Sequence, residues 1–415
     1  MQKAHGFNID IWNVYVTFTT KMVGYYCRAI LELKSTNPFP KTTESTLRPI
    51  VKYTKDNTRI AIIGGGNIGT QFACVCASKG YRVNVFTSKP EKFENVLEIV
   101  DEYEAVTVSK IALATSDIGE AVRDCQIVFV THPAFLLKNT AEKLLPHVTR
   151  DMNFCVLPGT GGAELAFKDC IRAGATLFGL QRVPSVARLE EYGKKVRCEG
   201  IRPELFLASI PNSKAPDLAE FISSLWNRPC NVLPNYLSVT LTPSNPILHP
   251  ARLRTLFCDY EAGKTYDHNP LFYGDWNDES SELLIACDQE LQDMLGIMDK
   301  LDLTNVRSLK LHYESDTVEA MTEKIRSIKS LNHLSSPMKE TADGWVPDFE
   351  SRYFTADFPY GLAIIEEIAG ILGYNAKNIF ETMDWYRKVT GNTKRLDIRD
   401  YGIRTVDDIY AVYGN

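Results

Sequence analysis

The sequence lacks the marks of several protein classes. Its ten cysteines lie scattered singly, with no Cys-x-x-Cys pair, so the pattern indicates free thiols in a reducing cytoplasm and no disulfide framework. No spacing of His, Cys and Asp suggests a metal site. No Gly-x-Ser-x-Gly elbow suggests a hydrolase.

Positive charge and long apolar runs are also scarce. The net charge of −6 argues against binding to nucleic acids or anionic membranes, because their phosphates require a basic face. Residues 11–33 are rich in aromatic side chains, but Lys21 and Arg28 divide them into apolar runs too short to span a bilayer. Residues 1–10 carry little charge and make a poor signal peptide. We therefore expect a cytoplasmic protein without nucleic-acid or membrane partners.

A glycine-rich turn organises the first half of the chain. Residues 60–63 are all apolar and predict a buried strand, and the proline-free residues 68–78 predict a helix. The glycines between them have the Gly-x-Gly-x-x-Gly spacing, in which the first permits a tight turn, the second admits a pyrophosphate and the third allows close packing. The helix N-terminus then attracts the phosphates. The residues expected to contact the dinucleotide here are Gly64, Gly66, Asn67, Ile68 and Gly69.

The segment after the second predicted strand, residues 81–86, bears on the choice of cofactor. An NAD-specific site usually has an acidic residue about 20 positions after the glycines. Here Thr87, Ser88 and Lys89 follow the strand, and the first carboxylate is Glu91. Hydroxyls and an ammonium group suit a 2′-phosphate, so we predict NADPH. The alternative is that Lys89 is solvated and NADH binds through other contacts.

Further apolar segments continue the α/β pattern to about residue 240. His132 and Pro133 follow one of them on its C-terminal side, where ligands of open α/β sheets bind. They are candidate cofactor contacts, with a simple turn as the alternative. Residues 158–162 contain three glycines and are expected to lie beside the nicotinamide unless they form only a turn. The expected strands are 106–113 (a strand or hairpin), 126–131, 153–157, 176–181, 196–199 and 205–209.

Helical periodicity replaces this pattern from Pro243 onward. The fold class predicted is α/β, with a Rossmann-type dinucleotide-binding domain in residues 58–240 followed by an all-helical domain in residues 241–415. Residues 1–57, which end in a stretch rich in proline, serine and threonine, are expected to form a helical arm and linker. The expected helices are 278–298, with Asp278 as the cap, and 318–328, 362–372, 378–387 and 406–412.

Two segments of the second half resemble one enzyme family. His249 precedes a proline at the start of that half, and residues 347–361 have the pattern Pro-Asp-Phe-x-x-Arg-Tyr-x-x-x-Asp-x-Pro-x-Gly. These segments resemble the octopine (opine) dehydrogenases, and the resemblance extends from about Arg59 to the end of the chain. Similar stretches of the same family are residues 192–196, 263–264, 270–273 and Trp276.

The resemblance implies reductive condensation of an amino acid with an α-keto acid, in which NAD(P)H reduces the resulting imine. By the family pattern His249 is the acid/base, Asp357 orients it and Arg352 binds a substrate carboxylate. Histidine suits proton transfer near neutral pH, and a carboxylate on its other nitrogen fixes the tautomer. A planar guanidinium holds a carboxylate through two bonds. From the residues alone, His249 could equally fill a gap at a helix start, and Arg352 could pair with Asp357.

The sequence also departs from the family around the keto-acid pocket. Thr160 stands where the family has glutamine, and Arg182 stands where it has threonine. Arg182 could anchor a second carboxylate or form a surface ion pair. Both departures put pyruvate and arginine in doubt as substrates.

Two other functions remain open. A 2-keto acid reductase of the ketopantoate-reductase type shares this architecture and needs no amine, and a cofactor-bound sensor or scaffold would need no turnover. The protein is expected to act on small molecules as a monomer or homodimer. Its remaining histidines are expected to be solvated; they are His5, His147, His268, His312 and His333.

Overall fold

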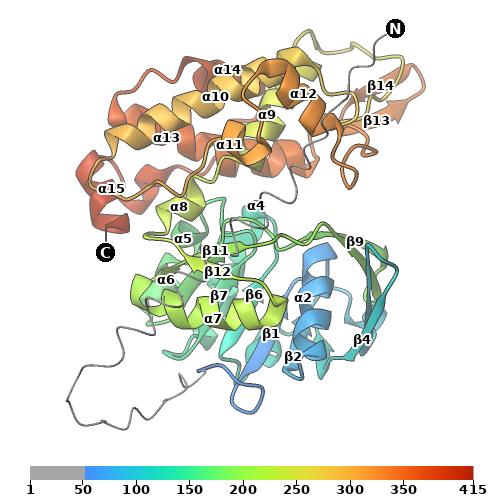
Figure 1. Ribbon diagram of the computed structural model, residues 1–415, viewed down its shortest axis with the longest axis vertical. Helices are drawn as coiled ribbons and strands as arrows, with labels where there is room; N and C mark the ends of the chain where they lie inside the picture. Colours follow the sequence, from blue (N-terminus) through green and yellow to red (C-terminus); the bar gives the residue numbers. More distant parts are fainter. Residues whose placement is uncertain (1–51, 415) are drawn as a thin grey trace, which may run out of the picture. The chain divides into compact units, whose positions relative to one another are not determined.

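The computed structural model describes residues 52–414, and the expected N-terminal arm lies outside the described residues except for its last few positions. An α/β half is followed by a mainly helical half (Figure 1). The predicted strand–turn–helix–strand unit is present as β1 (Arg59–Ile63), α2 (Asn67–Ser78) and β2 (Arg82–Phe86). The fold class predicted from the sequence, a Rossmann-like half followed by a helical domain, is confirmed.

The main sheet of the α/β half has eight strands. Neighbouring strands are parallel except at the β11–β8 pair, which is antiparallel. Strand β1 lies between β6 and β2, so the order of connection reverses at β1, the point where ligands bind in such sheets. The remaining strands are β12 (Cys230–Val232), β11 (Leu205–Ile210), β8 (Thr176–Leu180), β7 (Asn153–Val156), β6 (Ile127–Val130) and β5 (Leu113–Thr115).

A second sheet of four strands packs against α2. The strand predicted over residues 106–113 is present but ends at Lys110, because the chain changes sheets there: β5 joins the main sheet, while the preceding strand joins the second. The amide of Ile111 bonds to the Asn95 carbonyl of the second sheet, and the amide of Ala112 bonds to Val83 of the main sheet. The second sheet also includes strands that the sequence analysis missed. In spatial order it contains β4 (Val106–Lys110), β3 (Val96–Asp101), β10 (Lys195–Glu199) and β9 (Val186–Glu191).

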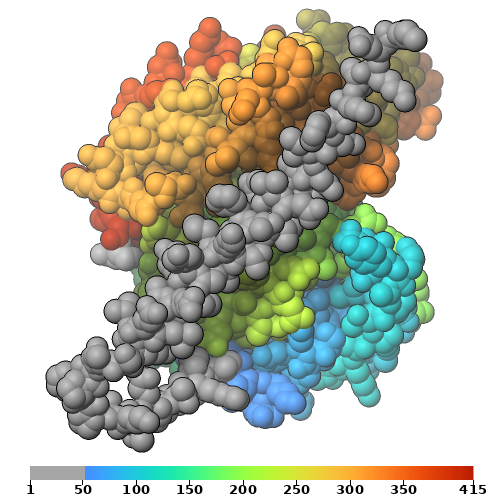
Figure 2. All heavy atoms as spheres, in the orientation of Figure 1, coloured from blue at the N-terminus to red at the C-terminus, as the bar shows by residue number. Residues whose placement is uncertain are grey.

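The second sheet lies at the surface of the α/β half, where the space-filling view shows the segment that includes β3 and β4 in cyan (Figure 2). Five α-helices and several short turns complete this half. Helix α4 begins directly after Pro133, which is its N-cap residue. The helices are α3 (Ile118–Val122), α4 (Ala134–Leu144), α5 (Ala163–Ala166), α6 (Lys168–Arg172) and α7 (Ala215–Trp226), and the 3-10 turns are η1 (Pro90–Lys92), η2 (Leu145–His147) and η3 (Asn212–Lys214).

The second half is helical except for one two-stranded hairpin, β13 (Met338–Thr341) and β14 (Gly344–Pro347). The expected cap of the long helix α10 is displaced by one residue: Asn277, not Asp278, caps it by accepting a bond from the amide of Ser280. The helices are α8 (Leu237–Thr240), α9 (Asn245–Leu256), α10 (Asp278–Ile297), α11 (Leu309–Tyr313), α12 (Val318–Arg326), the π-helix η4 (Tyr353–Leu362), α13 (Ala363–Leu372), α14 (Lys377–Thr390), the 3-10 turn η5 (Ile398–Tyr401) and α15 (Val406–Tyr413).

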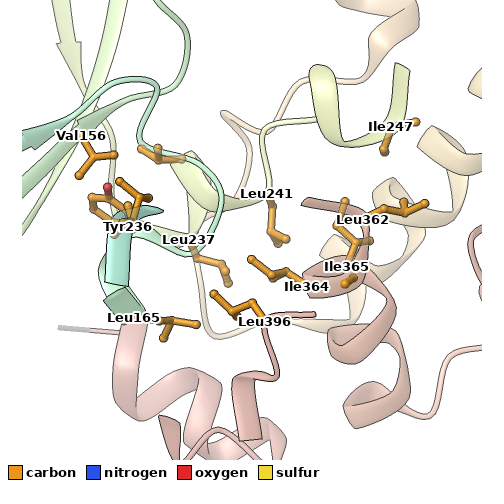
Figure 3. Packing of buried hydrophobic residues seen from close by; sticks show 14 of the residues in the cluster. Val156, Leu165, Tyr236, Leu237, Leu241, Ile247, Leu362, Ile364, Ile365 and Leu396 are labelled. Atoms are coloured by element: carbon orange, nitrogen blue, oxygen red, sulfur yellow. The ribbon is translucent and has the colours of Figure 1, made fainter. Parts of the chain in front are cut away.

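One hydrophobic cluster joins the two halves. It extends from one face of the main sheet into the helices of the second half. Figure 3 shows side chains from β7, α5, α8, α9 and α13 packed into this shared core. Burial of apolar surface contributes about 25 cal/mol per Å² to stability. Because such a core is closely packed, it fixes the positions of the residues on its two sides relative to one another. The labelled members are Val156, Leu165, Tyr236, Leu237, Leu241, Ile247, Leu362, Ile364, Ile365 and Leu396.

Candidate active site

The glycine turn after β1 has the geometry that a dinucleotide requires. Gly64 has a φ of +115°, and a Cβ there would lie 2.6 Å from the hydroxyl of Thr131. A Cβ on Gly69 would lie 1.7 Å from the Gly64 carbonyl oxygen, so helix and turn approach closely only because position 69 is glycine. No atom lies within 4 Å of a Cβ built on Gly66, which opens the α2 N-terminus to a ligand. The residues present therefore fit a bound pyrophosphate.

The side chains of Asn67 and Ile68, also predicted to contact the dinucleotide, instead contact other parts of the protein. The Asn67 side chain accepts a bond of 2.9 Å from the amide of Leu189, which ties α2 to β9. Ile68 packs on the core of the main sheet. Their backbone, at the first turn of α2, remains the part that faces a phosphate.

The end of β2 combines hydroxyl groups with a lysine. Thr87 is buried, whereas Ser88 and Lys89 are exposed. The Thr87 hydroxyl lies 2.5 Å from the hydroxyl of Tyr192, and the Lys89 ammonium lies 5.8 Å from the centre of the Tyr192 ring. Tyr192, on the turn between β9 and β10, therefore forms one wall beside the predicted cofactor residues. The sequence resemblance covers Tyr192, but its residue pattern gave no sign of this role.

His132 and the 158–162 loop lie at the same edge of the sheet. The ring of His132 reaches to 3.1 Å from a Cβ built on Gly64, and its Nδ1 lies 2.8 Å from the hydroxyl of Thr140. Burial, followed by the charge of Lys143, lowers the pKa of His132. In the loop, a Cβ on Gly161 would meet Ala134 and approach the carbonyl of Tyr360 in the helical half. Thr160, half-buried, lies in this loop between two glycines.

The structure brings His249 and Asp357 together. The Nδ1 atom of His249 lies 2.8 Å from Oδ2 of Asp357, and its Nε2 atom lies 2.8 Å from the hydroxyl of Tyr273. His249 is only 6% exposed. With the carboxylate accepting from Nδ1–H, Nε2 is the acceptor in the neutral ring and the Tyr273 hydroxyl donates to it. The imidazole is thus held from both sides.

Close packing of α9 against η4 brings His249 and Asp357 into contact. His249 and Pro246 are three residues apart on α9, so they share one face. A Cβ on Gly361 would lie 3.0 Å from Cβ of Pro246, which means that η4 reaches α9 only because residue 361 has no side chain. Asp357, four residues earlier on the π-helix, then faces His249. Wide helical turns of this kind are frequent at functional sites.

Aromatic rings enclose the histidine. The Tyr353 ring meets the imidazole edge to face at 4.4 Å, and the Phe272 ring meets it at 5.5 Å. Burial raises the pKa of Tyr273 well above its usual range, and the neighbouring groups Tyr353, Tyr313 and Asp357 raise it further. The Tyr273 phenol therefore stays protonated and able to donate near neutral pH. The sequence analysis included residues 270–273 in the family resemblance without assigning this hydroxyl a role.

The two predicted arginines have different surroundings. Arg352 is exposed at the start of η4, and the partner of Asp357 is His249, not Arg352. Arg182 follows β8, and its Nε and Nη2 atoms are buried without a hydrogen-bond partner. The expectation that His312 is solvated is wrong: burial, followed by the charges of Arg182, Arg202 and Arg307, lowers its pKa to about 3.

Two further properties of the described residues bear on this site. In residues 52–414 no group of three or more His, Cys, Asp or Glu side chains is arranged to hold a metal ion. None of the helices in that range combines the length and apolar content needed to cross a bilayer.

Two family models match the chain. Residues 232–390 match the model described as NAD/NADP octopine/nopaline dehydrogenase, alpha-helical domain. Residues 59–159 match the model described as NAD-dependent glycerol-3-phosphate dehydrogenase N-terminus. The first match contains His249, Tyr273, Arg352 and Asp357, and the second contains the glycine turn.

Several named proteins are similar over most of their length. The opine dehydrogenase of Haliotis discus hannai is 26% identical over 400 residues, which cover 85% of this chain and 98% of the relative. The tauropine dehydrogenase of Arabella iricolor is 24% identical over 365 residues, which cover 80% of this chain and 91% of the relative.

Among solved structures, octopine dehydrogenase in complex with NADH and agmatine has a TM-score of 0.73 at 23% identity, covering 85% of this chain and 97% of that one. This likeness shows that the two proteins share a fold. The resemblance predicted from the sequence is confirmed: residues 232–390 match the octopine/nopaline dehydrogenase helical domain, and the chain is similar to opine and tauropine dehydrogenases over most of their length.

Proposed function

We propose that this protein catalyses the NAD(P)H-dependent reductive condensation of an amino acid, or another amine, with an α-keto acid, giving an opine-type secondary amine. The observation that carries the proposal is the hydrogen-bonded series Asp357–His249–Tyr273, which lies within the matched family domain. In this proposal residues 58–240 bind the nucleotide and residues 241–415 supply the acid/base group.

His249 is the proposed general acid and base. Bound NAD(P)H would supply a hydride to the carbon of the imine. The nitrogen of the product needs a proton, and an imidazole is the side chain that can deliver one near neutral pH. Asp357 holds the ring by its Nδ1–H and stabilises its charged form, as the third member of a catalytic triad does. Nε2 is then the atom that exchanges a proton, either through the Tyr273 hydroxyl or directly after that hydroxyl moves aside.

Arg352 is the proposed clamp for a substrate α-carboxylate. Its guanidinium is exposed and its neighbour Asp357 is engaged by His249, so the guanidinium is available to a ligand. Two parallel bonds from a guanidinium would fix the orientation of a keto acid and hold its reacting carbon in place. Thr160, on the glycine loop beside Tyr360, is the proposed polar contact from the nucleotide side.

NADPH is the proposed cofactor in preference to NADH. The end of β2 presents Thr87, Ser88 and Lys89 and no carboxylate to bind a ribose 2′-hydroxyl. The ammonium of Lys89 and the paired hydroxyls of Thr87 and Tyr192 suit a 2′-phosphate. His132 and Pro133 are the proposed contacts on the neighbouring strand end.

A substrate panel separates this function from its rivals. Oxidation of NADPH would be followed with a keto acid alone and with the same keto acid plus each of several amino acids. We expect turnover that depends on the amine. Turnover without any amine would favour a keto acid reductase of the ketopantoate type, and no turnover with any pair would favour a cofactor-bound sensor or scaffold.

Substitution of His249 tests the acid/base assignment. His249→Asn is the sharper variant, because the asparagine amide can still donate to Asp357 while the exchanging nitrogen is lost. We expect turnover to fall by about three orders of magnitude while NADPH affinity changes less than about twofold. His333→Asn, at an exposed position, is the matched control. An equal loss of turnover and nucleotide binding would assign His249 a structural role.

The cofactor preference has its own measurement. Lys89→Ala should raise the KM for NADPH by about 10-fold, the size expected for one charge-assisted bond, and leave the KM for NADH nearly unchanged. Lys388→Ala, also at an exposed position, serves as the control. Equal effects on both nucleotides would contradict the assignment of Lys89 to a 2′-phosphate.

We further propose that the enzyme works in the cytoplasm as a monomer or homodimer. The cysteines between Cys74 and Cys287 are free thiols, and most of them are buried. Free thiols persist in a reducing compartment. Sedimentation of the purified protein would distinguish the two assembly states.

A further inference from the structure

Arg182 is a half-buried cation, and two nitrogens of its guanidinium are buried without a hydrogen-bond partner. It directly follows β8, whose C-terminal end lies at the sheet edge that also carries the glycine turn and the 158–162 loop. Within the described residues no hydrogen bond reaches its guanidinium, and its Nε and Nη2 atoms are fully buried. A buried guanidinium without a carboxylate is costly, so its presence points to a negative charge supplied from outside the chain.

Other cations surround Arg182 and make this cost larger. Arg202 bonds only to carbonyl groups, with its Nε donating to the Val183 carbonyl at 3.0 Å. Arg307 lies over the Phe206 ring at 5.4 Å, and its ion pair with Glu204 is exposed and loose at 3.9 Å. Burial, then the charge of Arg202 and, to a smaller extent, that of Arg307 lower the pKa of Arg182 to about 10, while Tyr313 acts in the opposite direction. We call Arg182, Arg202 and Arg307 the arginine cluster; its charge is not balanced by the carboxylates around it.

The arginine cluster interacts electrostatically with a residue that also acts on the proposed active site. Burial raises the pKa of Tyr313, on α11, while Arg182 and Arg202 lower it. The same Tyr313 is among the groups that raise the pKa of Tyr273, the hydrogen-bond partner of His249. Tyr313 therefore interacts electrostatically both with the arginine cluster and with Tyr273. The side chain of Gln181 also bonds to the Asn305 carbonyl at 3.1 Å, which ties the end of β8 to the helical half.

The phosphates of the cofactor are not the expected ligand. Strand β8 is separated from β2, where the 2′-phosphate would bind, by four strand spacings, or roughly 19 Å at about 4.8 Å each. The pyrophosphate belongs to the turn after β1, three spacings away. A bound substrate is the other source of negative charge that the proposed function supplies.

We propose that the arginine cluster binds a second acidic group, a carboxylate in the simplest case, carried by one of the two condensing substrates in addition to its α-carboxylate. This inference rests on the proposed function and narrows its substrate class to a dicarboxylic keto acid or a dicarboxylic amino acid. A cationic amino acid would meet like charges there. The guanidinium groups would orient the extended substrate, with Arg352 at its other end.

The test compares matched substrate pairs in the full-length enzyme. Rates of NADPH oxidation would be measured with pyruvate and L-alanine, with 2-oxoglutarate and L-alanine, and with pyruvate and L-glutamate. We expect one dicarboxylate pair to exceed the first pair in kcat/KM by about 10-fold or more. Which of the two does so identifies the substrate that carries the second acid. Equal values for all three pairs would overturn the inference while leaving the proposed function intact.

Variants then assign the preference to the cluster. In Arg182→Gln the ratio of kcat/KM between the preferred dicarboxylate pair and the first pair should fall about 10- to 100-fold. Arg202→Gln should lower it in the same direction, and Arg182→Lys should restore part of it. Arg172→Gln, which alters an exposed ion pair on α6, is the control. An unchanged ratio in both cluster variants would overturn the inference.

A binding measurement separates this inference from the proposed function. Succinate and butyrate would be titrated calorimetrically into the NADPH-saturated enzyme and its Arg182→Gln variant. Succinate should bind at least about 10-fold more tightly than butyrate in the wild type and lose that advantage in the variant. Selective succinate binding without turnover of any pair would reject the proposed reaction and retain the anion site. Equal binding of both acids would reject the anion site.

Discussion

The hydroxyl of Tyr273 decides how the histidine of this site meets a substrate. His249 has both ring nitrogens engaged, one by Asp357 and the other by Tyr273. The carboxylate contact sets the tautomer, but the atom left to exchange a proton is covered by a phenol. A proton therefore reaches a substrate either through the Tyr273 oxygen or after that oxygen moves away. In either version of the proposed mechanism Tyr273 takes part in the proton transfer, although the sequence predicted a role only for His249 and Asp357.

The first prediction concerns this hydroxyl. Tyr273→Phe keeps the ring against Phe272 and removes only the oxygen. We expect kcat to fall by about 10- to 100-fold, the size of a lost acid/base partner, with a smaller change in KM. The pH profile of kcat should change shape, because the proton-exchanging nitrogen has lost its partner.

Tyr260→Phe is the control for this change, since its ring packs on Phe349 away from His249. Steady-state rates between pH 6 and 9 would provide the comparison. If the Tyr273→Phe enzyme keeps the wild-type rate and pH profile of kcat, the phenol takes no part in catalysis.

At the scale of single elements, the π-helix η4 shows where local sequence patterns stop being informative. Pro359 and Gly361 lie inside it, and both residues are poor helix formers. The segment is helical because it packs on α9, where Gly361 allows the approach to Pro246. The family pattern singled out Arg352 and Asp357 in this segment as candidate site residues, whereas its helical form depends on a tertiary contact that no local pattern contains.

The same limit applies to the second sheet. Strands β3 and β10 pair in parallel, with Ile99 beside Val196, so the partners are far apart in sequence. Residues 60–63 were predicted correctly because a fully apolar run is a local signal. Strand β3 has a mixed pattern of buried and exposed residues. Its place in the sheet depends on pairing with β10, which the local sequence of β3 does not predict.

The second prediction is made for helix α10. Its Asp288 is 3% exposed and accepts a bond of 2.7 Å from the amide of Leu309 on α11. Burial raises the pKa of Asp288 to about 6 from an ordinary 3.8. Between these pH values the folded state holds this proton and the unfolded state does not, so the free energy of unfolding falls as pH rises through the window. The full loss is at most about 3 kcal/mol.

Asp288→Asn should remove this dependence, because an amide does not titrate and its oxygen can still accept from Leu309. The difference in unfolding free energy between variant and wild type should shift in favour of the variant as pH rises from about 4 to 6, whatever constant offset the substitution adds. Urea unfolding at several pH values would measure it. Asp293→Asn, on the same helix but exposed, should show no such trend.

At the scale of the whole molecule, the buried carboxyl of Glu164 ties together segments that are distant in sequence. Glu164 lies on α5, directly after the glycine loop, and is 4% exposed. Its Oε1 accepts bonds of 2.6 Å from Thr240 on α8 and 2.7 Å from Tyr413 on α15. The end of the helical half is thereby fastened to the loop that bears Thr160. The sequence predicted two successive domains, and one hydrophobic cluster of the structure extends through both.

The last prediction follows from this link. Tyr413→Phe leaves Glu164 with one donor fewer in a buried place, and an unsatisfied buried acceptor costs about 1–3 kcal/mol. Burial already raises the pKa of Glu164, and loss of the Tyr413 bond, which lowers that pKa, should raise it further. The destabilisation should therefore be smaller in acid, where the carboxyl is protonated in the folded state, and grow as pH rises through its folded pKa. Thermal unfolding at pH 5 and pH 8 would measure both effects. Tyr410→Phe is the matched control, because its hydroxyl makes a bond to Asp299 at the surface; equal shifts for the two variants would mean that the link to Glu164 contributes nothing to the joining of the halves.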